Sequence, residues 1–227
     1  MPTPQWILGI HTTTPVLGLA LLPVEEALGQ GHSQCWILDR QMAAQLHPCL
    51  GGFLASQDKQ QIVAIAVAVG PGSFTGSRLG VSVARLLGQQ LRIPVFGYST
   101  LATIARQVWQ EQGSPSNPLT VAVQMDAKRQ EWYGSVYRVE REQISALWLD
   151  QVWALEAWEQ ALENWPEAKR VDGAAFVDPL PVLALAELAR MDFSAGLRPS
   201  WQEVLPIYGR QPPIDPKVLN RSAPSPR

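Results

Sequence analysis

The chain has 227 residues and a net charge of −2, from 18 basic and 20 acidic residues, and it contains no long basic run. This balance argues against strong nucleic-acid binding by the chain alone, and DNA is not expected as a partner. Charged residues make up 17%, against about 25% in a typical domain; a surface partly covered by a partner explains this, and the alternative is the high content of Pro and Trp.

Cysteine usage and the apolar segments bear on the compartment. The two cysteines, Cys35 and Cys49, form no CxxC pair, which argues against a structural zinc site and favours free thiols in a reducing cytosol. The start MPTPQW lacks the features of a signal peptide, and the longest apolar run, Ile62 to Val69, is too short to span a bilayer. We therefore expect a soluble, cytoplasmic protein without membrane contact.

The chain opens with a predicted hairpin, Trp6 to Ile10 and Val16 to Leu22, around a polar turn. The hydroxyls of Thr12 and Thr13 in this turn are candidates for holding an anion, and the alternative is a turn whose threonines bond only to nearby backbone. A third strand is predicted over Gln34 to Asp39. A helix is predicted over Met42 to Leu54, with a kink or restart at Pro48.

The central stretch runs from Ile62 to Gly97. Its apolar, β-branched start predicts a buried strand, a glycine-rich turn follows, and the next apolar residues have helical spacing up to Pro94. Strand, turn, helix and strand form a βαβ unit. The turn has two readings left open: anion binding by Gly70, Gly72 and Ser73 at a helix start, or tight chain reversal alone.

Small residues recur at every fourth position of this predicted helix, so they lie along one ridge. Each glycine inside a helix costs about 1 kcal/mol relative to alanine, and a close contact with another backbone would offset that cost. We predict that a second protein lies against the ridge; the alternative is packing on the chain's own sheet. The ridge consists of Gly76, Gly80, Ala84 and Gly88.

The second half repeats the opening pattern of the first. A helix capped by Ser99 ends near Gln110, and a Gly/Ser/Pro-rich linker, residues 113–118, divides the chain. The predicted elements that follow are strands 120–125 and 131–139, helices 155–165 and 179–191, and a short strand 205–208. The expected boundaries are 1–112 for the first half, 113–211 for the second and 212–227 for a mobile tail.

The familiar catalytic motifs are missing from the sequence. Gly70, Gly72 and Gly76 have the wrong spacing for a P-loop or a dinucleotide fingerprint, and no HExxH, HxxxH or GxSxG occurs. Folding could assemble Asp126, Glu131 and Asp172, but no pattern requires it. We therefore predict no catalytic residue and no metal ligand.

The stretch from Val67 to Ala105 resembles the TsaB family of bacterial tRNA threonylcarbamoyladenosine biosynthesis proteins. GPGSFTG followed by RxG and then IPVFGYSTL carries the resemblance. WILGIHTTT, MDAKRQEWYGSVYR and VLPIYGR match the family's opening strand, its second-half hairpin and its C-terminal signature, so the similarity covers most of residues 6–210.

The resemblance implies an α/β fold of two actin-like, ribonuclease H-like halves, each opening with a β-hairpin and containing a mixed sheet flanked by helices. It implies a non-catalytic subunit that dimerises with a TsaD-like catalytic subunit and works with a TsaE-like ATPase on the adenosine next to the tRNA anticodon. Alone, the chain is expected to form a homodimer. ATP or ADP is a candidate only at an interface shared within the complex. The expected partner interface is Met42, Leu46, Gly76, Arg78, Leu79, Gly80, Val83, Ala84, Leu87 and Gly88.

The sequence departs from the family at His11, where the family usually has Asp. The main alternative function is an ATP-dependent small-molecule kinase of the same fold, which needs an aspartate at this turn. A metallopeptidase is a third reading, and the missing HxxxH argues against it.

Overall fold

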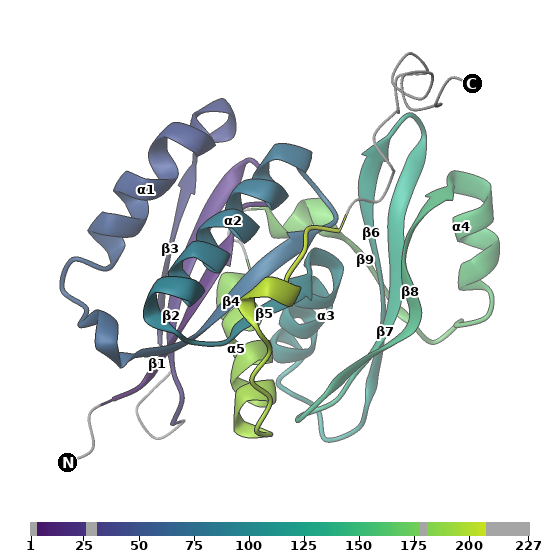
Figure 1. Ribbon diagram of the computed structural model, residues 1–227. Helices are drawn as coiled ribbons and strands as arrows, with labels where there is room; N and C mark the ends of the chain where they lie inside the picture. Colours follow the sequence, from purple (N-terminus) through teal and green to yellow (C-terminus); the bar gives the residue numbers. More distant parts are fainter. Residues whose placement is uncertain (1–3, 26–30, 178–180, 208–227) are drawn as a thin grey trace, which may run out of the picture.

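The computed structural model describes residues 4–25, 31–177 and 181–207. It contains two β-sheets flanked by helices, a five-stranded sheet in the order β3-β2-β1-β4-β5 and a four-stranded sheet in the order β8-β7-β6-β9 (Figure 1). Each sheet is mixed, and each half begins with an antiparallel pair, β1 with β2 and β6 with β7. The predicted α/β fold of two similar halves is confirmed.

The first sheet is built around β4, the apolar central strand. It pairs in parallel with β1 on one side and with β5 on the other, so it is buried on both faces as its composition predicts. The strands are β1 (Trp6–His11), β2 (Val16–Pro23), β3 (His32–Ile37), β4 (Ile62–Gly70) and β5 (Val95–Ser99).

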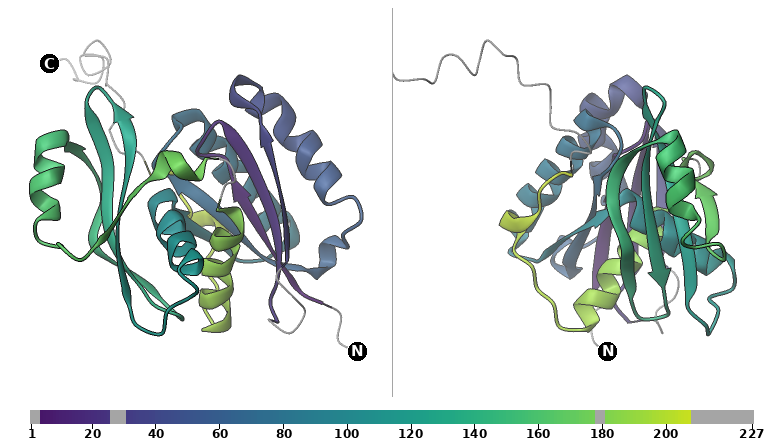
Figure 2. Two further views of the ribbon diagram at one scale, coloured as in Figure 1. Left: turned by 180° about the vertical axis from the view of Figure 1, so that it is seen from behind. Right: turned by 90° about the vertical axis from the view of Figure 1, so that its right-hand side faces the viewer.

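Helices lie on both faces of the first sheet, and two more helices pack on the second sheet (Figures 1 and 2). The helices α1 (Met42–Phe53), with Pro48 inside it, and α2 (Phe74–Leu91) share one apolar core with the sheet, and α5 (Val182–Ser194) packs on the opposite face. The helix α3 (Thr100–Glu111) packs on the second sheet and against α5, and α4 (Leu155–Leu162) covers that sheet's far face. The layers therefore run α1/α2, sheet, α5/α3, sheet, α4.

The second sheet contains two strands, β8 and β9, that the sequence does not predict. Its members are β6 (Leu119–Lys128), β7 (Glu131–Val139), β8 (Ile144–Ala154) and β9 (Lys169–Asp172). The edge strand β8 departs from regular register at two places along its pairing with β7, between Gly134 and Val136 and between Val136 and Tyr137. These irregularities disturb the alternation of side chains on which strand prediction depends.

The C-terminal part of the chain returns to the first sheet. Because α5 packs on β1, β2 and β4, the division at residue 113 does not separate the fold into two independent halves. The predicted strand 205–208 is wrong over 205–207, where no strand forms, although the N–H of Ile207 donates to the Val69 carbonyl at 2.8 Å. Tyr208 and the predicted tail, residues 212–227, lie outside the described residues. Within the described residues, no helix is long and apolar enough to cross a membrane.

Candidate functional site

The first hairpin turn is bonded to the starts of two helices. The Thr12 hydroxyl donates to the Gly76 carbonyl in α2 at 2.7 Å, and the hydroxyls of Thr13 and Thr100 lie 2.9 Å apart at the start of α3. The Ser73 N–H donates to the Thr13 carbonyl at 2.7 Å. Both threonines are buried, so the turn is a structural junction between β1, α2 and α3.

These bonds occupy several of the groups proposed for anion binding. The Ser73 hydroxyl accepts from the Gly76 N–H and caps α2, and a side-chain carbon on Gly72 would lie 2.2 Å from the Thr13 carbonyl oxygen. A carbon on Gly70 would lie 2.7 Å from the Ile207 carbonyl oxygen. The hydroxyls of Thr12, Thr13 and Ser73 are therefore bonded within the chain, and anion binding at the two turns stays a prediction.

His11 is fully buried at the end of β1. Neither ring nitrogen has a hydrogen-bond partner among the described residues, and burial lowers the pKa of His11 from 6.5 to about 4. The ring is therefore neutral at pH 7. It provides no carboxylate at the position where the kinase alternative needs one.

The ridge of small residues on α2 faces inward, so the prediction of a second protein along it is wrong. A side-chain carbon would lie 1.9 Å from the Thr12 carbonyl oxygen at Gly76 and 2.2 Å from the Thr12 hydroxyl at Gly80. At Gly88 it would lie 2.3 Å from a Val95 methyl, and Ala84 is fully buried. The close approach that the glycines permit is made by the first turn and β5 of the same chain.

Two more predicted interface residues, Met42 and Leu46, are buried in the core shared by α1, α2 and the first sheet, as is Val83. Their burial leaves little or no side-chain surface for contact with a partner. Leu79 and Leu87 are half-buried at the edge of that core. Of the predicted set only Arg78 is exposed, and its guanidinium lies 5.2 Å from the Phe74 ring centroid.

A second ridge on α2 faces outward. Phe74, Arg78, Ser82 and Leu86 are also spaced four residues apart, but two residues out of step with the glycines, which puts them on the opposite side of the helix. Phe74 is 48% exposed and Leu86 is 52% exposed. The sequence signal for this ridge was the four-residue spacing of Phe74, Arg78, Ser82 and Leu86.

The neighbouring helix α1 has an outward surface of small side chains. Ala43, Ala44, Gly51 and Gly52 are exposed, and a side-chain carbon at either glycine would meet nothing within 4 Å. The open glycine surface that the sequence led us to expect on α2 is therefore on α1. We define the helical face as eight of the exposed residues of the two helices, Ala43, Ala44, Gly51, Gly52, Phe74, Arg78, Ser82 and Leu86.

A partly buried polar cluster joins the two sheets, and the sequence analysis missed it. The hydroxyls of Ser99, at the end of β5, and Tyr137, on β7, both donate to the Asp150 carboxylate on β8. Burial raises the pKa of Asp150, against the lowering effect of these hydrogen bonds. A lone aspartate in the apolar stretch LWLDQVW was the available signal.

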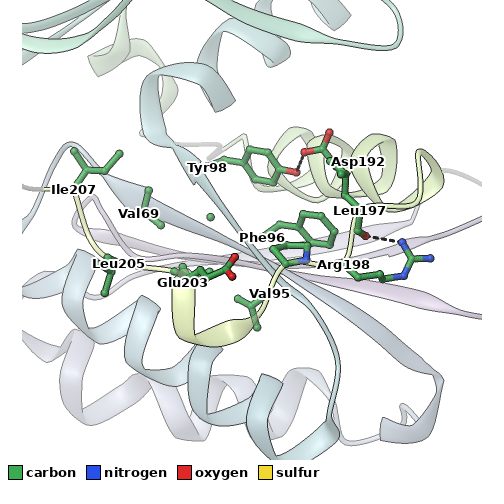
Figure 3. Close-up of a pocket in the computed structure, with 13 residues that line it drawn as sticks. Val69, Val95, Phe96, Tyr98, Asp192, Leu197, Arg198, Glu203, Leu205 and Ile207 are labelled. Atoms are coloured by element: carbon green, nitrogen blue, oxygen red, sulfur yellow. Dashed lines mark hydrogen bonds between the residues drawn. The ribbon is translucent and has the colours of Figure 1, made fainter.

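A cavity of about 640 Å³ lies between β5, the end of α5 and the segment 197–207 (Figure 3). Its apolar wall includes Val69, Val95 and Phe96, and the Tyr98 hydroxyl donates to Asp192 at 2.6 Å on one side. Burial is the main cause that raises the pKa of Tyr98, so this hydroxyl remains protonated. Within the described residues, no His, Cys, Asp or Glu side chains gather in a group of three that could hold a metal ion.

Comparison with known proteins relates this chain to proteins of tRNA threonylcarbamoyladenosine biosynthesis. Residues 37–195 match the family model described as TsaD, tRNA N6-adenosine threonylcarbamoyltransferase. A Bacillus subtilis protein named tRNA threonylcarbamoyladenosine biosynthesis protein TsaB is 30% identical over 70% of this chain and 66% of its own length. The Escherichia coli protein of the same name is 25% identical over 90% of this chain and 94% of its own length.

Solved structures agree with these relatives. The crystal structure of a Pseudomonas aeruginosa protein with similarity to the peptidase YeaZ has 26% identity and a TM-score of 0.72, and it covers 91% of this chain and 100% of its own. The structure of YeaZ from the same organism has 26% identity and a TM-score of 0.69, covering 90% and 99%. The chain therefore belongs to the threonylcarbamoyltransferase family that the TsaD model describes, and within it to the TsaB proteins.

Proposed function

We propose that this protein is a non-catalytic, cytoplasmic subunit of tRNA threonylcarbamoyladenosine biosynthesis. Its partner in this proposal is a TsaD-like catalytic subunit, assisted by a TsaE-like ATPase, and tRNA is the substrate of the assembly. The names of its curated relatives in Bacillus subtilis and Escherichia coli support the process. In the absence of the catalytic subunit, the protein forms a homodimer through the same surface.

The surface proposed for this pairing is the helical face. The exposed apolar side chains of Phe74 and Leu86 lie on α2, and α1, which presents Gly51 and Gly52, packs beside it on the same side of the first sheet (Figure 1). Apolar side chains beside bare backbone allow a partner helix to approach closely. This pairing of exposed apolar and small residues is the observation that carries the proposal.

The closed turn around Thr12 supports a role without chemistry. Its hydroxyls bond to α2 and α3, and the neighbouring His11 is neutral and fully buried. An ATP-dependent kinase, the alternative from the sequence, is not favoured by the relatives. Titration of the isolated protein with ATP and magnesium in a calorimeter is expected to give no tight binding.

The test is reconstitution of tRNA modification with and without this chain, combined with one charge substitution on the helical face. Leu86→Glu should abolish co-purification with the TsaD-like subunit and the modification that depends on it. The matched control is Leu149→Glu, a leucine that is 75% exposed on β8, far from α2. Normal pairing by Leu86→Glu, or equal loss in both variants, would remove the helical face from the proposal.

A further inference from the structure

The cavity of about 640 Å³ beside β5, which we call the β5 cavity, has an exposed apolar rim (Figure 3). Leu197, Leu205 and Ile207 line it, and they are 53%, 62% and 42% exposed. Nine large apolar residues are exposed among the described residues, and three of them border this one cavity. Val95 and Phe96 form its buried wall. Exposed apolar residues gathered around a hollow indicate a surface that another segment covers.

Two carboxylates border the same cavity. Asp192, near the end of α5, accepts from the Tyr98 hydroxyl at 2.6 Å, and Glu203 is exposed in the segment that forms the rim. Neither carboxylate has an ion pair with a described residue. Acidic side chains without a cation, placed beside apolar surface, suit an occupant that is both apolar and basic.

One guanidinium also lines the β5 cavity, and it is engaged with the backbone. Arg198 donates to the carbonyls of Phe193 and Leu197 at 2.7 and 2.6 Å, and its guanidinium lies 3.5 Å from the Phe193 ring centroid. Two carboxylates therefore face one guanidinium, which leaves an excess of negative charge at the cavity.

The chain itself continues from the rim of the β5 cavity. Ile207 is the last described residue, and residues 208–227, which we call the C-terminal segment, follow it in the sequence. Four of the 18 basic residues and one of the 20 acidic residues lie in this segment, so its net charge is opposite to that of the cavity. Its aliphatic pair, Val218 and Leu219, lies between two of these basic residues, Lys217 and Arg221.

The length of the C-terminal segment allows it to reach back to the cavity. An extended chain spans about 3.3–3.6 Å per residue, so the stretch from Ile207 to Val218 can leave the rim and return to it. Pro212, Pro213 and Pro216 lie in this stretch and lack a backbone N–H, so side chains rather than strand pairing must supply the contacts. A tethered segment has an effective concentration in the millimolar range, and weak contacts are then enough to hold it.

We propose that the C-terminal segment of this chain docks in the β5 cavity. Val218 and Leu219 lie against the apolar rim, and the basic residues on either side of them pair with Asp192 and Glu203. The polar, proline-rich composition predicts no core within the segment itself, and docking on the folded part of the chain needs none. The occupant of the cavity is thus supplied by the same molecule.

The test is limited proteolysis of the full-length protein with trypsin, in which mass spectrometry follows the rate of cleavage after Lys217. Cleavage should be slower in the wild-type protein than in a synthetic peptide of residues 208–227, because docking protects the bond. Leu205→Asn removes part of the apolar rim and should accelerate cleavage by about tenfold. The matched control is Leu149→Asn, an exposed leucine on β8, which should be cleaved after Lys217 at the wild-type rate.

A second variant tests the charged contacts. Asp192→Asn combined with Glu203→Gln removes both negative charges and keeps a side-chain oxygen that can accept from the Tyr98 hydroxyl. It should accelerate cleavage after Lys217 by about threefold, as expected for the loss of exposed ion pairs. Continued resistance of the folded part of the chain to trypsin shows that each variant remains folded.

Three results would overturn the proposal. They are equal cleavage rates in the wild-type protein and the peptide, equal rates in Leu205→Asn and Leu149→Asn, and protection that disappears when the protein is diluted tenfold. The last result would assign the cavity to the segment of a second copy, because a segment docked in its own chain is protected at any protein concentration. The helical face takes no part in this experiment, so its outcome is independent of the pairing proposed above.

Discussion

Alanine substitutions at two helix glycines should have opposite effects on stability. Gly76 lies in the first turn of α2 and Gly51 in the last turn of α1, so both replacements gain helix propensity of alanine, at most about 0.5–1 kcal/mol. Their surroundings differ. The new carbon at position 76 would lie 1.9 Å from the Thr12 carbonyl oxygen, whereas at position 51 it would meet nothing within 4 Å.

The magnitude at Gly76 follows from that distance. Real side-chain carbons essentially never approach closer than 3.0 Å, and the obstructing atom is backbone, which cannot rotate away. Overpacking of this kind costs about 1–3 kcal/mol, and displacing the turn also weakens the Thr12–Gly76 hydrogen bond, worth about 1 kcal/mol. After the propensity gain, we expect Gly76→Ala to lose about 2 kcal/mol and Gly51→Ala to gain about 0.5 kcal/mol or more.

Urea unfolding followed by tryptophan fluorescence measures both changes. A loss of about 2 kcal/mol corresponds to a melting temperature lower by about 4–8 °C in a chain of this size. If Gly76→Ala unfolds at the same urea concentration as the wild type, the ridge does not pack on the first turn as described. If Gly51→Ala is destabilised as strongly as Gly76→Ala, the difference in surroundings is not what controls the outcome.

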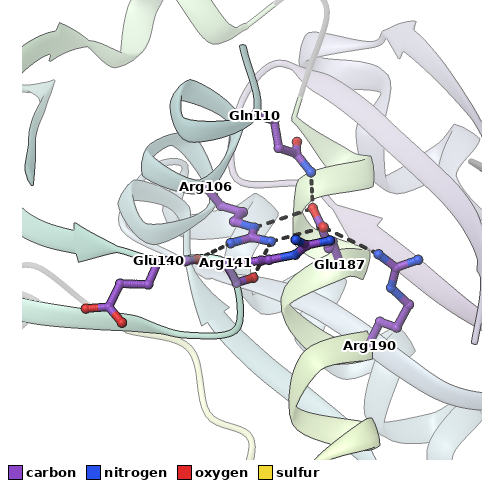
Figure 4. Close-up of polar contacts among 6 residues, drawn as sticks. All are labelled: Arg106, Gln110, Glu140, Arg141, Glu187 and Arg190. Atoms are coloured by element: carbon purple, nitrogen blue, oxygen red, sulfur yellow. Dashed lines mark hydrogen bonds and ion pairs between the residues drawn. The ribbon is translucent and has the colours of Figure 1, made fainter. Parts of the chain in front are cut away.

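Two further substitutions test buried polar groups. Burial lowers the pKa of His11 from 6.5 to about 4, so protonation of the ring favours the unfolded state. The free energy of unfolding should therefore fall by about 3 kcal/mol as the pH falls from 6.5 to 4. His11→Asn should lack this loss in urea unfolding at a series of pH values. Arg106→Ala breaks the buried ion pair with Glu187 (Figure 4) and leaves the carbonyls of Glu140 and Arg141 without their donor, so it should cost about 3–5 kcal/mol, against about 1 kcal/mol or less for the exposed Arg170→Ala. Equal unfolding midpoints for the two arginine variants would contradict the larger contribution to stability that we assign to the Arg106–Glu187 pair.

Much of the first half could be predicted from the sequence because its signals are local. The apolar run before Gly70 predicts β4, and the Ser99 cap predicts the start of α3, where its hydroxyl accepts from the N–H groups of Leu101 and Ala102. Pro48 lies inside α1, which runs from Met42 to Phe53, so the helix does not restart at Pro48. These elements depend on neighbours in the sequence, so their residues identify them directly.

The proposed partner surface could not be predicted in the same way. The spacing of Gly76 and Gly80 correctly indicates a close approach, but the sequence does not reveal which backbone approaches, and Thr12 is 64 residues away from Gly76. The same limit applies to Asp150, whose partners Ser99 and Tyr137 come from other elements. Spacing along a helix defines a face, whereas the identity of the neighbour is decided by topology.

The irregular edge strand β8 has a consequence for how this protein associates. A strand that leaves register twice cannot offer an uninterrupted row of N–H and C=O groups to an incoming chain, and the opposite edge of that sheet, β9, has only four residues. Sheet extension from copy to copy, the usual route to fibres, is thus obstructed at both ends. The protein can therefore carry an exposed leucine, Leu149, on β8 without strand pairing between copies, and association with a partner is left to the helices.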